Sequence, residues 1–221
     1  MTFYDVIDIL FMIFFGVILW PVAVGLRQWM HIGKANQLLT IFLVLLMCLE
    51  IYAYVLAIFK IRNHYIHYLN TLLIIWFTVF FYSIGKKNVY PSYLLAAIVS
   101  ICIPVEIIVL VGYNNINTVT EFVARMILVV YAFNALKSII KDLNDSQIHQ
   151  NSNLYIQLGL FIYGFFSAIT SMFKKYFIET ALDLYFFCDT LSFVMGAVAF
   201  CLFAIGLRLS TSKKINTYAS L

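Results

Sequence analysis

Charged side chains are scarce in this sequence. Asp, Glu, Lys and Arg make up 11% of its 221 residues, about half of their share in a typical soluble domain. Hydrophobic residues make up 64%, and the mean hydropathy is +0.96. No polar segment is long enough to form a soluble domain. These deficits exclude an ordinary water-soluble globular protein and predict an all-α, polytopic integral membrane protein in a lipid bilayer.

Residue patterns that carry known chemistry are also missing. The four cysteines all fall in apolar runs without a CxxC or Cys/His spacing, which favours buried free thiols over a metal site. The sequence has no GxSxG, no HExxH and no pair of histidines suited to haem. A retinal-type photoreceptor would need a lysine in the middle of the last apolar run, and none is there. We therefore expect no catalytic residues, no metal and no cofactor.

Seven apolar runs approach the length of about 20 residues that a helix needs to cross a bilayer. They lie at roughly residues 9–26, 38–59, 68–84, 93–112, 119–136, 154–173 and 184–207. The sequence thus predicts a single domain, residues 1–221, built as a bundle of seven transmembrane helices. The first run lacks a basic leader and a small-residue cleavage site, so we interpret it as a retained helix and not as a signal peptide.

Basic residues are unevenly distributed between alternate loops. One set of loops carries nine: Arg27, Lys34, Lys86, Lys87, Lys137, Lys141, Arg208, Lys213 and Lys214. The opposite loops carry four: Lys60, Arg62, Lys174 and Lys175. Because cytoplasmic loops hold the excess of Lys and Arg, the N-terminus is predicted outside and the C-terminus in the cytoplasm. This bias explains the formal charge of +4 without a nucleic-acid partner.

Ionisable residues inside a membrane span are costly and indicate functional sites. Glu106 in the fourth run and Arg125 in the fifth lie about equally far from the turn that joins the two runs. They are therefore predicted to sit at matching depth and to form an intramembrane ion pair. Glu121, four residues before Arg125, offers the arginine a second partner on its own helix. Such an arrangement fits either a switch or a static network.

Two further acids, Glu50 and Asp189, fall at the middle or in the outer half of their runs. Tyr54 shares a helix face with Glu50 and is placed to bond its carboxyl. Together with Glu106 and Arg125, these residues predict an outward-facing polar pocket above an inner half nearly free of charge. That asymmetry argues against a continuous pore. Three acids against one base favour a small cationic ligand or a proton.

The outer turn before the third run is basic and aromatic. Its residues His64 and His67 are typical of interfacial anchors, with pH sensing or ligand contact as the alternative. Glu121, His64 and His67 are therefore accessory candidates at the outer face. On the cytoplasmic side, the polar loop 137–153 and the C-terminal tail are the surfaces predicted to bind a soluble partner protein.

The segment NHYIHYLNTLLII, residues 63–75, lies in a chain of seven spans with short loops. In this it resembles small stand-alone bacterial seven-helix membrane proteins akin to the membrane sensor modules of signalling kinases. The resemblance implies a sensory protein of the bacterial cytoplasmic membrane that acts through a separate partner, and it assigns no site residue. Two other functions stay open: a small proton- or cation-coupled secondary transporter, and a scaffold subunit of a larger membrane complex.

Overall fold

The computed structural model of the chain describes residues 3–61, 63–111, 118–142 and 150–219, with side chains except at 3–11, 64, 109–111, 142, 175 and 212–219. The apolar runs form helices, because a backbone in lipid must satisfy its hydrogen bonds internally. The elements are α1 (Phe3–Arg27), α2 (Lys34–Ile58), α3 (His64–Ser83), α4 (Tyr90–Val105), the π-helix η1 (Glu106–Val111), α5 (Val119–Asp142), α6 (Ser152–Thr180) and α7 (Leu182–Ala219). No strand occurs in the described ranges, which confirms the all-α prediction.

Six of these helices, α2 to α7, are long and apolar enough to cross a membrane. Within the described side chains, α1 contributes a shorter apolar stretch, Met12–Arg27. Large apolar side chains are exposed on every helix from α1 to α7, for example Leu94 on α4 and Phe133 on α5. A water-soluble protein would bury such a surface, whereas lipid covers it at no cost. The chain is therefore a helical integral membrane protein.

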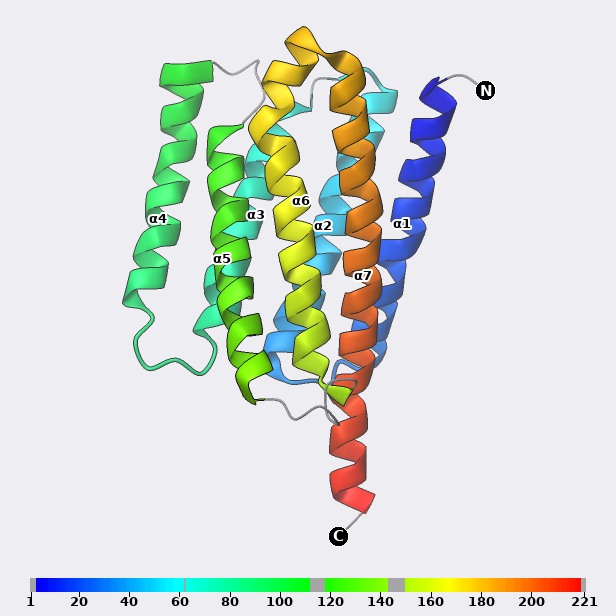
Figure 1. The fold of residues 1–221 in the computed structure, drawn as a ribbon, viewed down its shortest axis with the longest axis vertical. Coiled ribbons are helices and arrows are strands. Elements are labelled where there is room, and N and C mark those ends of the chain that lie inside the picture. Colours follow the sequence, from blue (N-terminus) through cyan, green and yellow to red (C-terminus); the bar gives the residue numbers. More distant parts are fainter. Residues whose placement is uncertain (1–2, 62, 112–117, 143–149, 220–221) are drawn as a thin grey trace.

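The helices run up and down in one bundle (Figure 1). In neighbour order, α2 packs on α1 and α3, α3 packs on α5, α6 lies between α5 and α7, and α7 returns to α1. Helix α4 stands at the edge, against α3 and α5 (Figure 1). We call the end that holds the α2–α3 and α6–α7 connections the upper end, and the opposite end, where α7 extends beyond the bundle, the lower end (Figure 1).

Aromatic rings cross the middle of the bundle. Phe42 on α2 stacks on Phe77 on α3 with centroids 4.0 Å apart. Tyr163 on α6 lies 6.5 Å from Phe42 and 6.1 Å from Phe200 on α7, and Phe200 lies 5.1 Å from Phe14 on α1. These five rings, here called the aromatic layer, join five helices. Below them the buried side chains of the described residues carry no charge. They include the apolar Leu39, Leu160 and Phe203 and the polar Asn36, Thr40 and Gln157.

Helices α6 and α7 approach closely in the lower half of the bundle. A Cβ added at Gly159 would lie 2.6 Å from the Phe203 ring, and one at Gly206 would lie 2.7 Å from Ile156. The Ser152 hydroxyl donates to the Gly206 carbonyl at 2.8 Å. Glycine is required here because two helix backbones meet without room for a side chain. The lower half of this helix pair is therefore tightly packed.

The fourth predicted span, 93–112, is divided in two. Helix α4 begins earlier, and at Glu106 it gives way to η1. The change follows Pro104, which lacks the amide that would bond the Ser100 carbonyl. Elsewhere the helices continue past the apolar runs, so residues 137–142 of the predicted loop 137–153 belong to α5. Residues 143–149 of that loop lie outside the described ranges.

Candidate functional site

A cavity of about 170 Å³ lies in the upper half of the bundle, with Tyr163 of the aromatic layer in its lining. Six helices contribute to its wall, and α4 is not among them. Its polar lining residues are Glu50 from α2, His67 and Asn70 from α3, Glu121 and Arg125 from α5, Ser167, Thr170, Ser171 and Lys174 from α6, and Asp189 and Ser192 from α7. The structure thus brings Glu50, Arg125 and Asp189 together around one space.

Arg125 forms an ion pair with Glu121, and not with Glu106 as the matching depths predicted. Its Nη2 and Nε donate to Glu121 Oε1 at 2.7 and 3.2 Å. Both side chains are buried, and the guanidinium lies 5.7 Å from the centre of the Tyr163 ring, within cation–π range. Arg125 Nη1 makes no hydrogen bond to any described residue. The pair therefore neutralises its own charge within the wall of the cavity.

Glu106 has a different role, at the start of α5. Its Oε1 accepts from the amides of Thr118 and Val119 at 3.2 and 3.1 Å. Its Oε2 accepts from the amide of Thr120 at 2.9 Å and from the Thr120 hydroxyl at 2.6 Å. The first amides of a helix have no partners within the helix and carry partial positive charge, so a carboxylate is well placed there.

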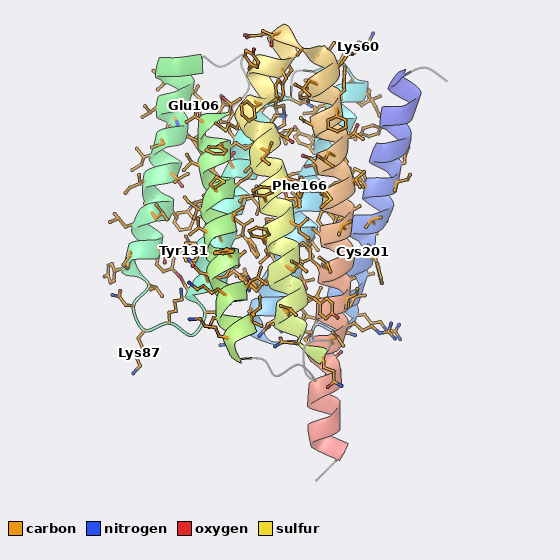
Figure 2. All side chains as sticks on the ribbon, viewed as in Figure 1. Lys60, Lys87, Glu106, Tyr131, Phe166 and Cys201 are labelled. Atoms are coloured by element: carbon orange, nitrogen blue, oxygen red, sulfur yellow. The ribbon has the colours of Figure 1, made fainter. Side chains whose placement is uncertain are left out.

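Glu106 therefore caps α5 and does not line the cavity. It lies near the upper end of the bundle on the α4 side (Figure 2). Two conditions explain why the predicted ion pair does not form. The unsatisfied amides of α5 take both oxygens of Glu106, and Glu121, one turn before Arg125, already supplies the arginine with a carboxylate on the same helix.

Glu50 and Asp189 are the two acids of the cavity that have neither a hydrogen-bond donor nor an ion-pair partner among the described residues. Both side chains are partly exposed, and both line the cavity. No described residue donates a hydrogen bond to either carboxyl group. Glu50 lies eight residues before the end of α2 and Asp189 seven residues after the start of α7. Two carboxyl groups inside a bundle without protein donors need water, a proton or a bound cation.

Lys174 belongs to α6 and lines the cavity, although the sequence had suggested a loop position for it. Its Nζ lies 3.4 Å from His67 Nε2, so the accessory candidate His67 also lies at the cavity. The side chain of His64 lies outside the described part of the chain. Tyr54 is half-buried on α2 and is not a lining residue.

Small hydroxyl residues complete the wall between α6 and α7. Thr170 Oγ1 and Ser192 Oγ are hydrogen-bonded across the two helices, and Ser192 also donates to the Phe166 carbonyl at 3.2 Å. On α3, Asn70 is 7% exposed, and its Oδ1 accepts no hydrogen bond from the described residues. Asn70 Oδ1 and Arg125 Nη1 are therefore two buried polar atoms, both on residues that line the cavity, without a hydrogen bond from the described residues.

Sequence reasoning missed most of these polar lining residues, although a signal was present. Ser167, Thr170, Ser171 and Lys174 follow the spacing i, i+3, i+4, i+7, which places them on one face of α6. Asn70 lies three residues after His67 on the same face of α3. The stripe on α6 points to a wet interior, because lipid would not favour it on the outside.

The charges of the cavity nearly balance. Glu121 and Arg125 cancel, which leaves Glu50 and Asp189 against Lys174. One negative charge is in excess unless a proton or a cation is bound. In the described part of the chain, no group of three His, Cys, Asp or Glu side chains is arranged to hold a metal ion.

Comparison with known proteins does not assign the cavity. No protein-family model, curated protein or solved structure matches the chain. The function of the site is therefore inferred from its own residues.

Proposed function

We propose that this chain is a membrane sensor protein that binds a small cationic ligand in the cavity and acts through a separate partner protein. The observation that carries the proposal is the pair Glu50 and Asp189. They enter the cavity from opposite parts of the chain, and no described residue donates a hydrogen bond to them. A bound ammonium group would supply both donors and charge. The excess negative charge of the lining favours the same ligand.

The size and walls of the cavity limit the ligand. A volume of about 170 Å³ corresponds to about six waters or to one small organic cation, at about 30 Å³ for each water. Phe14, Phe193 and Tyr163 form its aromatic part, and aromatic faces attract ammonium groups. A small primary or quaternary amine fits these features better than a large or an anionic ligand.

Orientation follows from the distribution of basic residues. The lower end holds the larger number of Lys and Arg and faces the cytoplasm, so the cavity faces outward. Helix α1 serves as the seventh span. Its 25 residues extend over about 37 Å at 1.5 Å per residue, which exceeds the ~30 Å hydrocarbon core. The localisation that fits these features is the cytoplasmic membrane of a bacterium.

A sensor is favoured over a transporter because of what lies below the cavity. The aromatic layer joins five helices there. Beneath it, the described residues bury no charged side chain, and α6 and α7 pack closely. A ligand in the cavity contacts several helices at once and therefore biases how they pack. The partner would bind at the lower end, at loop 137–153 or along the end of α7, which projects from the bundle (Figure 1).

Ligand binding is tested by thermal unfolding of the purified protein in detergent with methylammonium, choline, putrescine, Na⁺ and K⁺. At least one amine should raise the melting temperature of the wild type. Glu50→Gln and Asp189→Asn should each abolish that shift, whereas Glu179→Gln, the same type of change at an exposed position of α6, should keep it. If no cation shifts the wild type, the ligand proposal is wrong.

Transport is tested with the amine that binds, in liposomes that contain the protein. A sensor should bind the amine and accumulate none inside. Uptake that is lost in Glu50→Gln would instead establish the cation-coupled transporter. A chain that is unstable in detergent, responds to no cation and recovers only when a second protein co-purifies would favour the scaffold subunit.

A further inference from the structure

A second hollow lies at the lower end of the bundle, far from the cavity. It is a groove of about 500 Å³ between α2, α3 and α4. One part of its lining is polar and includes Lys34 and Ser83. The other part is apolar and includes Ile41 and Phe80, which are 43% and 42% exposed. The groove therefore has the two-part character of a phospholipid, with a polar end and an apolar length.

The polar end of the groove is positive. Lys34 is exposed and forms no ion pair with any described residue. It is also the first residue of α2, and the preceding Gly33 provides no side-chain cap. The first amides of α2 are therefore available to an anion, and the helix dipole adds to the charge of Lys34.

Ser83 gives a second and independent indication of a ligand. It is 9% exposed, and its hydroxyl makes no hydrogen bond to any described residue. A buried hydroxyl without a partner is costly. Ser83 lines the groove, so an oxygen-rich group that reaches its hydroxyl would accept the hydrogen and remove this cost. Because Ser83 lies at the lower end of α3, it contributes from the wall opposite α2.

We propose that this groove binds an anionic phospholipid. The phosphate lies between Lys34, the start of α2 and Ser83, and an acyl chain runs along Ile41 and Phe80. Charge complementarity selects an anionic over a zwitterionic lipid, since nothing acidic in the described lining balances Lys34. Trp29, also in the lining, is typical of the interface at which headgroups lie. The proposal is independent of what the cavity binds.

Native mass spectrometry of the delipidated protein measures the binding directly. Phosphatidylglycerol should bind more tightly than phosphatidylcholine with the same acyl chains, and glycerol phosphate at equal concentration should not bind. Lys34→Gln should weaken phosphatidylglycerol binding about fivefold and leave phosphatidylcholine unchanged. Lys137→Gln, at an exposed position near the lower end of α5 and outside the groove, should weaken neither.

Ser83→Ala separates the headgroup site from general charge attraction. The substitution removes a hydroxyl and leaves the charge unchanged. Loss of the hydroxyl should weaken phosphatidylglycerol binding, and the lipid-free protein should be equally or slightly more stable because a buried hydroxyl without a partner is gone. Equal weakening in Lys34→Gln and Lys137→Gln, with no effect of Ser83→Ala, would mean that the lipid is held by diffuse charge and would overturn the proposal. Binding of glycerol phosphate as tight as that of the lipid would also overturn it, since the apolar wall would then contribute nothing.

Discussion

Glu106 and Glu50 are both acids in the upper half of the bundle, but their surroundings have little in common. Glu106 accepts four hydrogen bonds, one from Thr118, the residue before α5, and three from Val119 and Thr120, its first two residues. Glu50, like Asp189, accepts none from the described residues. A carboxylate with hydrogen-bond donors can remain charged without a ligand. A carboxylate without donors is costly to bury, and a bound ligand can supply the missing donors. The position of an acid along its apolar run therefore predicts its depth in the membrane, whereas the hydrogen-bond donors around it determine whether it caps a helix or lines the cavity.

The start of α5 connects the two regions. The Thr118 carbonyl accepts a hydrogen bond from the Phe122 amide, so Thr118 is the N-cap residue of α5. Glu121 follows three residues later. In a capping box, the acid at that third position would bond the N-cap amide. Here Glu106 accepts that amide, and Glu121 instead binds Arg125 at the cavity. Because Glu106 at the start of η1 caps α5, the Glu121 carboxylate pairs with Arg125 and not with the N-cap amide.

Loss of Arg125, the ion-pair partner of Glu121, should have the largest effect on stability. Arg125→Met leaves the buried Glu121 without its counter-ion and should cost about 3–5 kcal/mol in the free energy of unfolding. The double variant Arg125→Met with Glu121→Leu should recover much of this loss. Reversible unfolding in mixed detergent micelles, followed by circular dichroism, measures both.

The control for this experiment is Arg125→Met combined with Glu106→Leu. Since Glu106 is bound to α5 and not to Arg125, this double variant should be less stable than either single variant. Recovery of stability in this variant would mean that Glu106 and Arg125 are paired after all.

Removing the cap of α5 should have the next largest effect. Glu106→Ala leaves three amides and one hydroxyl without their acceptor, and should cost about 2–3 kcal/mol. Glu106→Gln keeps one oxygen and should cost less. The same unfolding measurement applies, with the exposed Glu179→Gln as the control that should not change. Equal stabilities of Glu106→Ala and the wild type would contradict the capping role.

The all-α fold and its long apolar helices could be predicted from the sequence, because bilayer thickness sets the length of an apolar run. The ends of the helices were less predictable. An apolar run ends where the hydrocarbon of the membrane ends, but backbone hydrogen bonding continues beyond it, so α6 extends to Thr180 and α7 to Ala219. The π-helix at Glu106 depends on how α4 meets the start of α5, which no single run reveals.

The candidate site could be predicted in part. Counting depth along each run placed Glu50, Arg125 and Asp189 at the middle or in the outer half of the membrane, and the structure brings the three residues together around one cavity. The pairing of Glu106 with Arg125 was wrong because equal depth does not say which donors are nearer. Lys174 was assigned to a loop because charge near the end of a run resembles an interface residue, whereas the helical spacing of its polar neighbours carried the better signal.

A change in cavity volume without a change in charge should have a smaller effect. Gly196 and Phe14 both line the cavity, and a Cβ added at Gly196 would lie 2.9 Å from Phe14 Cε2, so Gly196→Ala adds a methyl group to the wall and displaces the Phe14 ring. The cost should be about 1 kcal/mol, and the amine-dependent shift in melting temperature should shrink. Gly16→Ala on α1, where no neighbouring atom lies within 4 Å, should leave the shift intact. Equal amine responses would mean that the ligand does not occupy this cavity.

The smallest effect on stability is expected for the cavity acids themselves. Without a ligand, Glu50→Gln and Asp189→Asn should change the free energy of unfolding by no more than about 0.5 kcal/mol, because neither carboxyl loses a protein donor. The same carboxyl-to-amide change at Glu106 should be clearly destabilising. Measured side by side at neutral pH, the three variants compare one chemical change in two surroundings. If Glu50→Gln were as damaging as Glu106→Gln, the Glu50 carboxylate would stabilise the fold, and its role would be structural and not one of ligand recognition.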